Sequence, residues 1–300
     1  MSGNNENDEP TPASTLSRDS LFCRCPLNCG GELQTSRITL AEGPLLRCTM
    51  CGQLLSSCTR DRYETALKKW DTSNGTTPET QSAARFRQVI ERRLRYALRL
   101  LGRSSPSPLR LLDVGCSSGA LLAVATKLGY SPCGVEIARK AAETAQRAGF
   151  DVFCGLLHDA RFPDAAFDVI TAFELIEHLN DPLLLLNECS RILKPDGILI
   201  VNTPNASSWT AGVMRECWDG FNLSSMGGHV SFFSPRSLAY LAGQCGFRVE
   251  RLETRRVRFA ESHHVSPVVY RVLKVMGEVL SIPASLLNKG HDMLAFLRKV

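Results

Sequence analysis

The residues best suited to bind a charged small molecule lie in the segment 110–122, Arg-Leu-Leu-Asp-Val-Gly-Cys-Ser-Ser-Gly-Ala-Leu-Leu. Gly115 and Gly119 allow a tight turn that a ligand can approach without meeting a Cβ atom, and the amides that follow can face that ligand. Asp113 precedes the turn. Glu136 follows it at about the 20-residue spacing at which an acid holds a ribose diol. The pattern indicates a nucleoside-type ligand.

The same turn fits a second pattern. Gly115-Cys-Ser117-Ser-Gly119 matches the G-x-S-x-G nucleophile elbow of serine hydrolases, which also lies between a strand and a helix. A hydrolase has no need of a carboxylate at position 113, and two acids at adjacent strand ends suit a nucleoside better than an acyl-enzyme. We therefore favour a nucleoside-type cofactor.

Two carboxylates and an imidazole, Glu174, Glu177 and His178, follow the apolar run 167–173. On a helical turn, positions i, i+3 and i+4 share one face. Side chains at these positions could hold Mg²⁺ or another divalent ion against a hydroxyl oxygen of the substrate that accepts the transferred group, and the ion would lower the pKa of that hydroxyl. The alternative has no metal: Glu174 contacts the cofactor, Glu177 is solvated or caps backbone amides, and His178 is a base or a wall of the acceptor site. We favour the alternative.

Two cysteine pairs near the N-terminus, Cys25 with Cys29 and Cys48 with Cys51, have the spacing of zinc ligands. Four thiolates leave no open coordination position, so we expect a structural or docking role. So short a segment has little core of its own, and the metal would supply its folding free energy. Cys23 could replace Cys25 as a ligand. A metal-free loop with buried cysteines is the competing interpretation.

The elements that position these residues alternate between strand and helix from residue 109 onward, which predicts a parallel α/β sheet with helices on both faces. We expect strands at 111–114, 131–136, 151–154, 167–172, 198–202, 247–257 and 293–298, and helices at 120–128, 138–148, 182–193 and 234–245. Residues 204–233 read as a long loop of the kind that carries function. Its Trp209, Trp218 and Phe221 would stack against an acceptor or pack in the core.

From about residue 105 onward the chain resembles class I S-adenosylmethionine-dependent methyltransferases. Their first motif, acid-x-Gly-x-Gly-x-Gly, matches 113–119 with Ser117 in place of the middle glycine, and 167–179, 191–197 and 201–205 are similar to the later motifs. The resemblance implies a Rossmann-like seven-stranded sheet and S-adenosylmethionine as cofactor. The cofactor contacts that we predict are Asp113, Gly115, Cys116, Ser117, Gly119, Glu136, Ile137, Asp159 and Phe173.

The resemblance extends to the acidic motif and to the cysteines. The pattern Glu-x-x-Glu-His occurs in ubiquinone-pathway O-methyltransferases and in small-RNA 2′-O-methyltransferases, where it is associated with metal. A later histidine completes the site in the RNA enzymes, and His229 matches it, which gives a possible divalent site of Glu174, Glu177, His178 and His229. A zinc ribbon before a methyltransferase domain is also known in this family.

Two amphipathic segments allow more than one interpretation. In and just after the helix 82–101, basic residues lie mostly off the apolar stripe, and we favour a solvated face over an RNA surface. These basic residues are Arg85, Arg92, Arg93, Arg95, Arg99 and Arg103. In the insertion 265–287, we favour core or lid packing over contact with a membrane surface; the apolar residues are Val268, Val272, Val275, Met276, Val279 and Leu280.

Composition limits the remaining choices. The chain is 44% apolar and 22% charged, as in soluble globular proteins, and a net charge of +5 does not by itself indicate a nucleic-acid partner. No apolar run reaches the ~20 residues needed to span a bilayer. The polar, acidic N-terminus is unlike a secretory signal, so we expect a cytoplasmic protein whose 12 cysteines are thiols or metal ligands.

These observations predict a disordered tail (1–20), a zinc ribbon (21–60), a linker with a helix (61–105) and a methyltransferase domain (106–300). The leading hypothesis is O-methylation of a small-molecule, sugar or lipid-linked acceptor. The alternatives are 2′-O-methylation of RNA gripped by the ribbon and the arginine helix, and a non-catalytic module that binds the cofactor or a protein partner.

Overall fold

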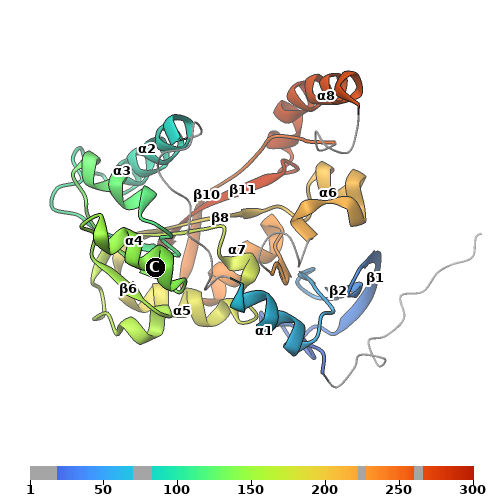
Figure 1. The fold of residues 1–300 in the computed structure, drawn as a ribbon, viewed down its shortest axis with the longest axis horizontal. Coiled ribbons are helices and arrows are strands. Elements are labelled where there is room, and N and C mark those ends of the chain that lie inside the picture. Colours follow the sequence, from blue (N-terminus) through green and yellow to red (C-terminus); the bar gives the residue numbers. More distant parts are fainter. Residues whose placement is uncertain (1–18, 70–82, 222–227, 260–265) are drawn as a thin grey trace, which may run out of the picture.

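The computed structural model describes residues 19–69, 83–221, 228–259 and 266–300. At its centre is a seven-stranded sheet of order β10-β11-β8-β7-β4-β5-β6, in which β11 alone runs antiparallel to its neighbours (Figure 1). The strands are β4 (Arg110–Val114), β5 (Ser131–Glu136), β6 (Val152–Cys154), β7 (Phe167–Phe173), β8 (Leu193–Pro204), β10 (Phe247–Arg255) and β11 (Asp292–Lys299). The predicted Rossmann-like α/β sheet is confirmed.

The central strands are buried on both faces, because successive side chains point to opposite sides of a sheet. Leu111 and Val169 join a core that includes α2 and α3, whereas Leu112 and Ile170 join a second core that includes α5 and α7. The bounds of the helices are α2 (Ala83–Leu100), α3 (Ala120–Leu128), α4 (Arg139–Arg147), α5 (Pro182–Ile192) and α7 (Pro235–Gln244).

The cysteine-rich segment builds a second, four-stranded sheet of order β1-β2-β3-β9. It comprises β1 (Leu33–Leu40), β2 (Gly43–Cys48) and β3 (Leu54–Leu55), followed by the helix α1 (Arg60–Lys68), and its last strand is β9 (Ser231–Phe232) from the α/β domain. The ribbon is therefore joined to that domain by strand pairing. Residues 1–18 of the predicted tail 1–20 lie outside the described residues. Ser20, at the end of that tail, forms an isolated antiparallel β-bridge with Thr59.

Residues 204–233 are more ordered than the predicted loop. They contain α6 (Trp209–Met214), two short 3-10 helices, η5 (Arg215–Cys217) and η6 (Asp219–Phe221), and the strand β9, while 222–227 lie outside the described residues. Trp218 and Phe221 are buried in a core with Leu45 of the ribbon. Of the two uses proposed for these aromatics, core packing holds for this pair.

The insertion forms the helix α8 (Pro267–Leu286), which projects beyond the edge formed by β10 and β11 (Figure 1). The expected core packing is wrong for most of its apolar side chains, which are 48–74% exposed; they are Val268, Val272, Val275, Met276 and Val279. The buried positions on this helix are the small residues Gly277 and Ala284. Among the described residues, no helix has the length and apolar character to cross a bilayer.

Candidate active site

The predicted strand–turn–helix unit lies at the carboxyl edge of the sheet. Gly115 has φ 78° and Gly119 has φ 85°, a region that glycine enters without cost. A Cβ atom at Gly119 would lie 2.9 Å from the Phe150 ring, so this position needs glycine for space as well. Ser117 also has a positive φ, of 50°. The serine that replaces the family's middle glycine thus keeps a backbone conformation that glycine prefers.

Glu136 ties the end of β5 to this turn. Its carboxylate accepts hydrogen bonds from the backbone amides of Ser117 and Ala138, both at 2.8 Å, and the residue is 7% exposed. A carboxylate has about four lone-pair sites, so oxygen lone pairs remain for a ribose diol. The ribose contact itself stays a prediction.

Asp113 lies beneath the turn and joins β4 to β7. The Thr171 hydroxyl donates a 2.6 Å hydrogen bond to its Oδ1. Burial raises the pKa of this carboxyl from 3.8 to about 7, although the Thr171 hydrogen bond lowers it. A positively charged cofactor above the turn would favour the ionised form. The contact of Asp113 with the methionine part of the cofactor stays a prediction.

The carboxyl edge beyond β5 and β6 carries exposed apolar side chains. Ile137, after β5, is 49% exposed, and Leu156, after β6, is 47% exposed. Asp159 is exposed on the 3-10 helix η3 (Leu157–Ala160), where it lies 3.3 Å from His158. Cys116 faces the other way, into the core, so only its backbone lines the turn. Leu156 was not among the predicted cofactor contacts. The sequence feature that could have indicated it is an apolar residue just beyond a strand at this edge.

The acceptor side begins where β7 ends, at the 3-10 helix η4 (Ile176–His178). Glu177, His178 and His229 are all buried, and their ligand atoms lie within 4.8 Å of one another. The two imidazole rings meet edge to face with centroids 4.6 Å apart. A Cβ atom at Gly115 would lie 3.6 Å from Leu175, so this segment abuts the cofactor turn. We call these three residues the histidine cluster.

Burial disfavours the charged forms of Glu177 and His229. The Thr203 hydroxyl donates a 2.8 Å hydrogen bond to Oε2 of Glu177, while Oε1 has no hydrogen-bond partner in the described part of the chain. Desolvation, and then the charge of Glu174, raise the pKa of Glu177 well above 4.5. Desolvation lowers the pKa of His229, whose Nδ1 lies 3.0 Å from the Gly220 carbonyl oxygen. A cation would favour an ionised Glu177 and neutral imidazoles, so the donor set fits a divalent metal.

Glu174 is not part of the histidine cluster. The expected face of a helical turn is wrong here, because Glu174 has φ 48° and the turn begins only at Ile176. Its carboxylate instead accepts a hydrogen bond from the Asn202 side-chain amide. Desolvation raises the pKa of Glu174 to about 7, but the residue is largely open to solvent, which screens this effect.

Arg93 completes this side of the site and was not predicted. It donates a 2.6 Å hydrogen bond to Oδ1 of Asn202 and stacks 4.8 Å from the centroid of Phe173. Desolvation lowers the pKa of its guanidinium to about 10. The signal was present in the sequence, because Arg93 lies three residues after Ile90 and four before Ala97, on the buried stripe of α2.

The four predicted zinc ligands come together in the ribbon. The sulfur atoms of Cys25 and Cys51 lie 3.6 Å apart and those of Cys29 and Cys48 lie 3.2 Å apart. All four ligand atoms lie within 4.8 Å of one another. Zn–S bonds of about 2.3 Å place tetrahedral sulfurs ~3.8 Å apart, so the arrangement fits zinc. Cys23 is exposed and outside the group, which leaves Cys25 as the candidate ligand.

The ribbon contacts the backbone of the histidine cluster directly. The Tyr63 hydroxyl, on α1, donates a 2.8 Å hydrogen bond to the carbonyl of His178. The amide of Ser56 donates to the carbonyl of Val230, whose own amide donates to the carbonyl of Glu177, both at 2.9 Å. These bonds connect the cysteine-rich segment to the histidine cluster.

The arginine helix α2 covers the sheet at the other end of the molecule from the ribbon (Figure 1). It buries Ile90, Leu94 and Ala97, whereas Phe86, expected on the apolar stripe, is 41% exposed. The other helical arginines are exposed; they are Arg85, Arg87, Arg92, Arg95 and Arg99. The ribbon and α2 therefore do not form one continuous basic surface.

Comparison with known proteins agrees with this geometry. The family described as "Methyltransferase domain" matches residues 83–252. A ubiquinone biosynthesis O-methyltransferase of Thiobacillus denitrificans is 30% identical over 52% of this chain and 72% of its own length. One of Rhodopseudomonas palustris is 31% identical over 43% of this chain, which spans only 50% of that relative.

A solved S-adenosylmethionine-dependent methyltransferase of Archaeoglobus fulgidus has the same fold. It superimposes with a TM-score of 0.50 at 22% identity, over 71% of this chain and 94% of its own. The family match, the relatives and the shared sheet agree with the strand–turn–helix unit described above. The chain therefore belongs to the class I S-adenosylmethionine-dependent methyltransferases.

Proposed function

We propose that this enzyme transfers the methyl group of S-adenosylmethionine to a hydroxyl oxygen of a small-molecule, sugar or lipid-linked acceptor. The observation that carries the proposal is the histidine cluster, Glu177, His178 and His229, next to the cofactor turn. A hydroxyl must lose a proton when it is methylated, so it needs a base or a metal, whereas an amine acceptor needs neither. The names of the relatives support an oxygen acceptor.

Each part of the site has a separate role in this proposal. The cofactor supplies an electrophilic methyl group on its sulfonium. The turn Gly115–Gly119 borders the methionine part of the cofactor, Glu136 holds its ribose, and Leu175 packs between this turn and the acceptor side. A neutral imidazole of His178 or His229 accepts the acceptor proton. Burial of these groups excludes water from the reacting atoms.

The finer proposal is a divalent ion held by Glu177, His178 and His229. One carboxylate and two imidazoles suit zinc, manganese or iron better than Mg²⁺, which prefers oxygen ligands. An ion here would act as a Lewis acid and lower the pKa of the acceptor hydroxyl. The unpartnered Oε1 of the buried Glu177 supports this assignment.

We also propose that Cys25, Cys29, Cys48 and Cys51 hold a structural zinc ion. Four thiolates leave no position for substrate. The metal would hold β2 and β3 in place, and β3 pairs with β9 beside the histidine cluster. Twelve cysteines without a disulfide suit a reducing cytoplasm, which is the location that we propose.

Labelled methyl transfer tests the acceptor class. The purified protein would be incubated with methyl-labelled cofactor and matched acceptors that carry a phenol, a sugar hydroxyl or an amine. We expect label only on oxygen, as an ether that survives mild base. His178→Ala should lower kcat by about 10²–10⁴ with cofactor affinity unchanged, and the exposed His158→Ala serves as control. Label on nitrogen, or full activity in His178→Ala, would overturn the proposal.

Elemental analysis separates the two metals. The wild type should carry zinc in the ribbon and a second ion in the histidine cluster, so His229→Ala should lose the second ion and keep the zinc. If wild type and His229→Ala hold the same amount of metal, the divalent-ion proposal is wrong, while base catalysis by His178 stays testable by its own variant.

A further inference from the structure

The helix α8 packs against the protein through its small and polar residues. A Cβ atom at Gly277 would lie 2.4 Å from the carbonyl oxygen of Val257, so the helix lies directly against the backbone of the segment after β10. The Ser281 hydroxyl accepts a 3.0 Å hydrogen bond from the amide of Val257. The Ser285 hydroxyl donates one of 2.6 Å to the carbonyl of Thr254. These contacts fix which face of the helix points outward.

The outward face of α8 is apolar. Its residues recur at spacings of three and four, the period of one helix face, and are 55–81% exposed; they are Val268, Val272, Val275, Val279, Ile282 and Leu286. This pattern is the reverse of a helix that packs its apolar side inward. A continuous exposed apolar stripe of this kind marks an interaction surface.

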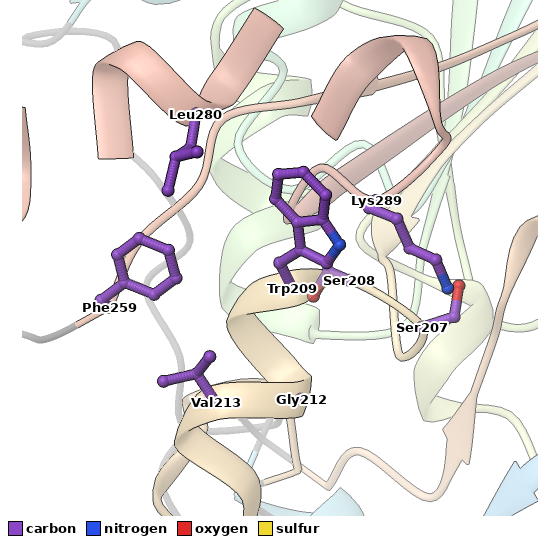
Figure 2. A pocket seen from close by; sticks show the side chains of 8 residues that line it. All are labelled: Ser207, Ser208, Trp209, Gly212, Val213, Phe259, Leu280 and Lys289. Carbon is purple, nitrogen blue, oxygen red and sulfur yellow. The ribbon is translucent and has the colours of Figure 1, made fainter. Parts of the chain in front are cut away.

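The apolar surface continues across a groove to α6. Figure 2 shows Trp209 and Val213 of α6 on one side, with Leu280 of α8 and Phe259, from the segment after β10, facing them. The groove has a volume of about 560 Å³, and Lys289 is its one charged lining residue. None of its lining residues belongs to the cofactor turn or to the histidine cluster.

The surface is also basic. Arg258, Arg271, Lys274 and Lys289 make no ion pair with the residues that the structure describes. Arg271 and Lys274 are exposed on α8 and, together with Glu278, lie on one flank of the helix beside the apolar stripe. Glu278 is the only acidic residue on the helix.

We propose that α8 and the adjoining α6–α8 groove form a docking surface for a bilayer that contains anionic lipid. The stripe from Val268 to Leu286 would enter the boundary between headgroups and acyl chains, and Arg271, Lys274 and Lys289 would meet lipid phosphates. The helix lies in the plane of the interface and does not cross the bilayer, because its inward face is tied to β10 and the residues that follow it.

Charge favours a bilayer over a second copy of the chain. In a two-fold symmetric contact both subunits offer the same patch. The stripes would then bury each other, but the excess positive charge that Arg271, Lys274 and Lys289 give each copy would meet the same excess opposite, with Glu278 as the one acidic side chain on α8. An anionic lipid surface neutralises that excess and covers the apolar stripe at once.

Vesicle sedimentation of the full-length protein tests this inference. The vesicles would be phosphatidylcholine alone, or phosphatidylcholine with phosphatidylglycerol. We expect at least tenfold tighter binding to the anionic vesicles, weakened by added salt. Absence of sedimentation with anionic vesicles would overturn the inference. So would a wild-type dimer in light scattering that Val279→Glu converts to a monomer, because that outcome assigns the stripe to a second copy.

Variants locate the contact on α8. Val272→Glu with Val279→Glu should lower vesicle affinity at least tenfold, and Arg271→Glu with Lys274→Glu should remove the preference for anionic vesicles. Leu184→Glu, at a 54% exposed position on α5, is the matched control and should bind like wild type. Cofactor affinity, unchanged in every variant, reports that the fold is intact. Equal loss in the α8 variants and in Leu184→Glu would refute the assignment.

Discussion

The two halves of the carboxyl edge are built in different ways. The cofactor half comes from one stretch of chain, 110–138, in which Glu136 reaches back to the amide of Ser117. The acceptor half is assembled from segments far apart in the sequence, with Tyr63 and His229 meeting at His178. From this comparison we expect cofactor binding to depend much less on a folded ribbon than acceptor chemistry does.

Loss of the ribbon metal should separate the two halves most strongly. Structural zinc contributes about 10–16 kcal/mol to folding of small domains, so Cys25→Ser should unfold the ribbon, release β9 and abolish methyl transfer. Calorimetry should still find a cofactor Kd within about threefold of the wild-type value, which corresponds to a change of ~0.6 kcal/mol in binding free energy. Cys23→Ser, outside the sulfur group, is the control and should keep zinc and activity. Equal loss of cofactor affinity in Cys25→Ser would show that the halves are not independent.

Glu136→Gln should damage the cofactor half alone. The Glu136 carboxylate accepts hydrogen bonds from two backbone amides, and the glutamine side chain would turn an N–H donor towards one of them. Hydrogen bonds to charged groups contribute about 1.5–3 kcal/mol. Cofactor affinity should fall by up to about 100-fold in calorimetry, with the metal content of the histidine cluster unchanged. The exposed Glu143→Gln on α4 provides the comparison. If Glu136→Gln binds the cofactor with wild-type affinity, then Glu136 is not part of the cofactor site.

Asp113 gives the cofactor half its own pH dependence. Because burial raises its pKa from 3.8 to about 7, the contribution of this carboxyl to stability is greatest below pH 4 and is lost as the pH rises through 7. Without cofactor, the free energy of unfolding of the wild type should fall between pH 5 and pH 8 by roughly 2–3 kcal/mol more than that of Asp113→Asn. Urea unfolding at each pH measures the difference. If the free energy of unfolding depends on pH in the same way in wild type and Asp113→Asn, then Asp113 is ionised in the folded protein.

Tyr63→Phe tests the link between ribbon and acceptor half with one atom. It removes the hydrogen bond to the carbonyl of His178, which is worth about 1 kcal/mol. We expect a drop of that size in the free energy of unfolding and a severalfold lower kcat, with cofactor affinity unchanged. Tyr240→Phe, at a partly exposed position on α7, controls for loss of a hydroxyl. If kcat stays at the wild-type value, the bond stabilises the ribbon without positioning His178.

Ser117→Gly should have the smallest effect. Glycine adopts the positive φ of this position without strain, a gain of up to about 1 kcal/mol that the greater freedom of the unfolded chain partly offsets. Cofactor affinity should change by less than about threefold, and unfolding measurements should show no loss of stability. A large loss of affinity would mean that the serine side chain itself contacts the cofactor.

The fold and the cofactor half were largely predictable. Buried strands, the glycines of the turn and Glu136 at its expected spacing each have a local signature. The acceptor half was predictable only in part. His229 was proposed from the resemblance, but the departure of Glu174 from the cluster depends on its backbone at φ 48°, and the role of Arg93 depends on where α2 lies against β8. The outward stripe of α8 was misassigned because periodicity defines a face without saying what covers it.

The amino-acid sequence by itself determined the α/β alternation, the glycine turn and the two cysteine pairs, because these features depend on backbone preferences and on spacings within a few residues. Only the tertiary structure decided that β3 pairs with β9, that the ribbon supports the histidines, and that α8 turns its valines to the solvent. Those outcomes depend on which surfaces meet after long loops close, and no local pattern in the chain encodes that choice.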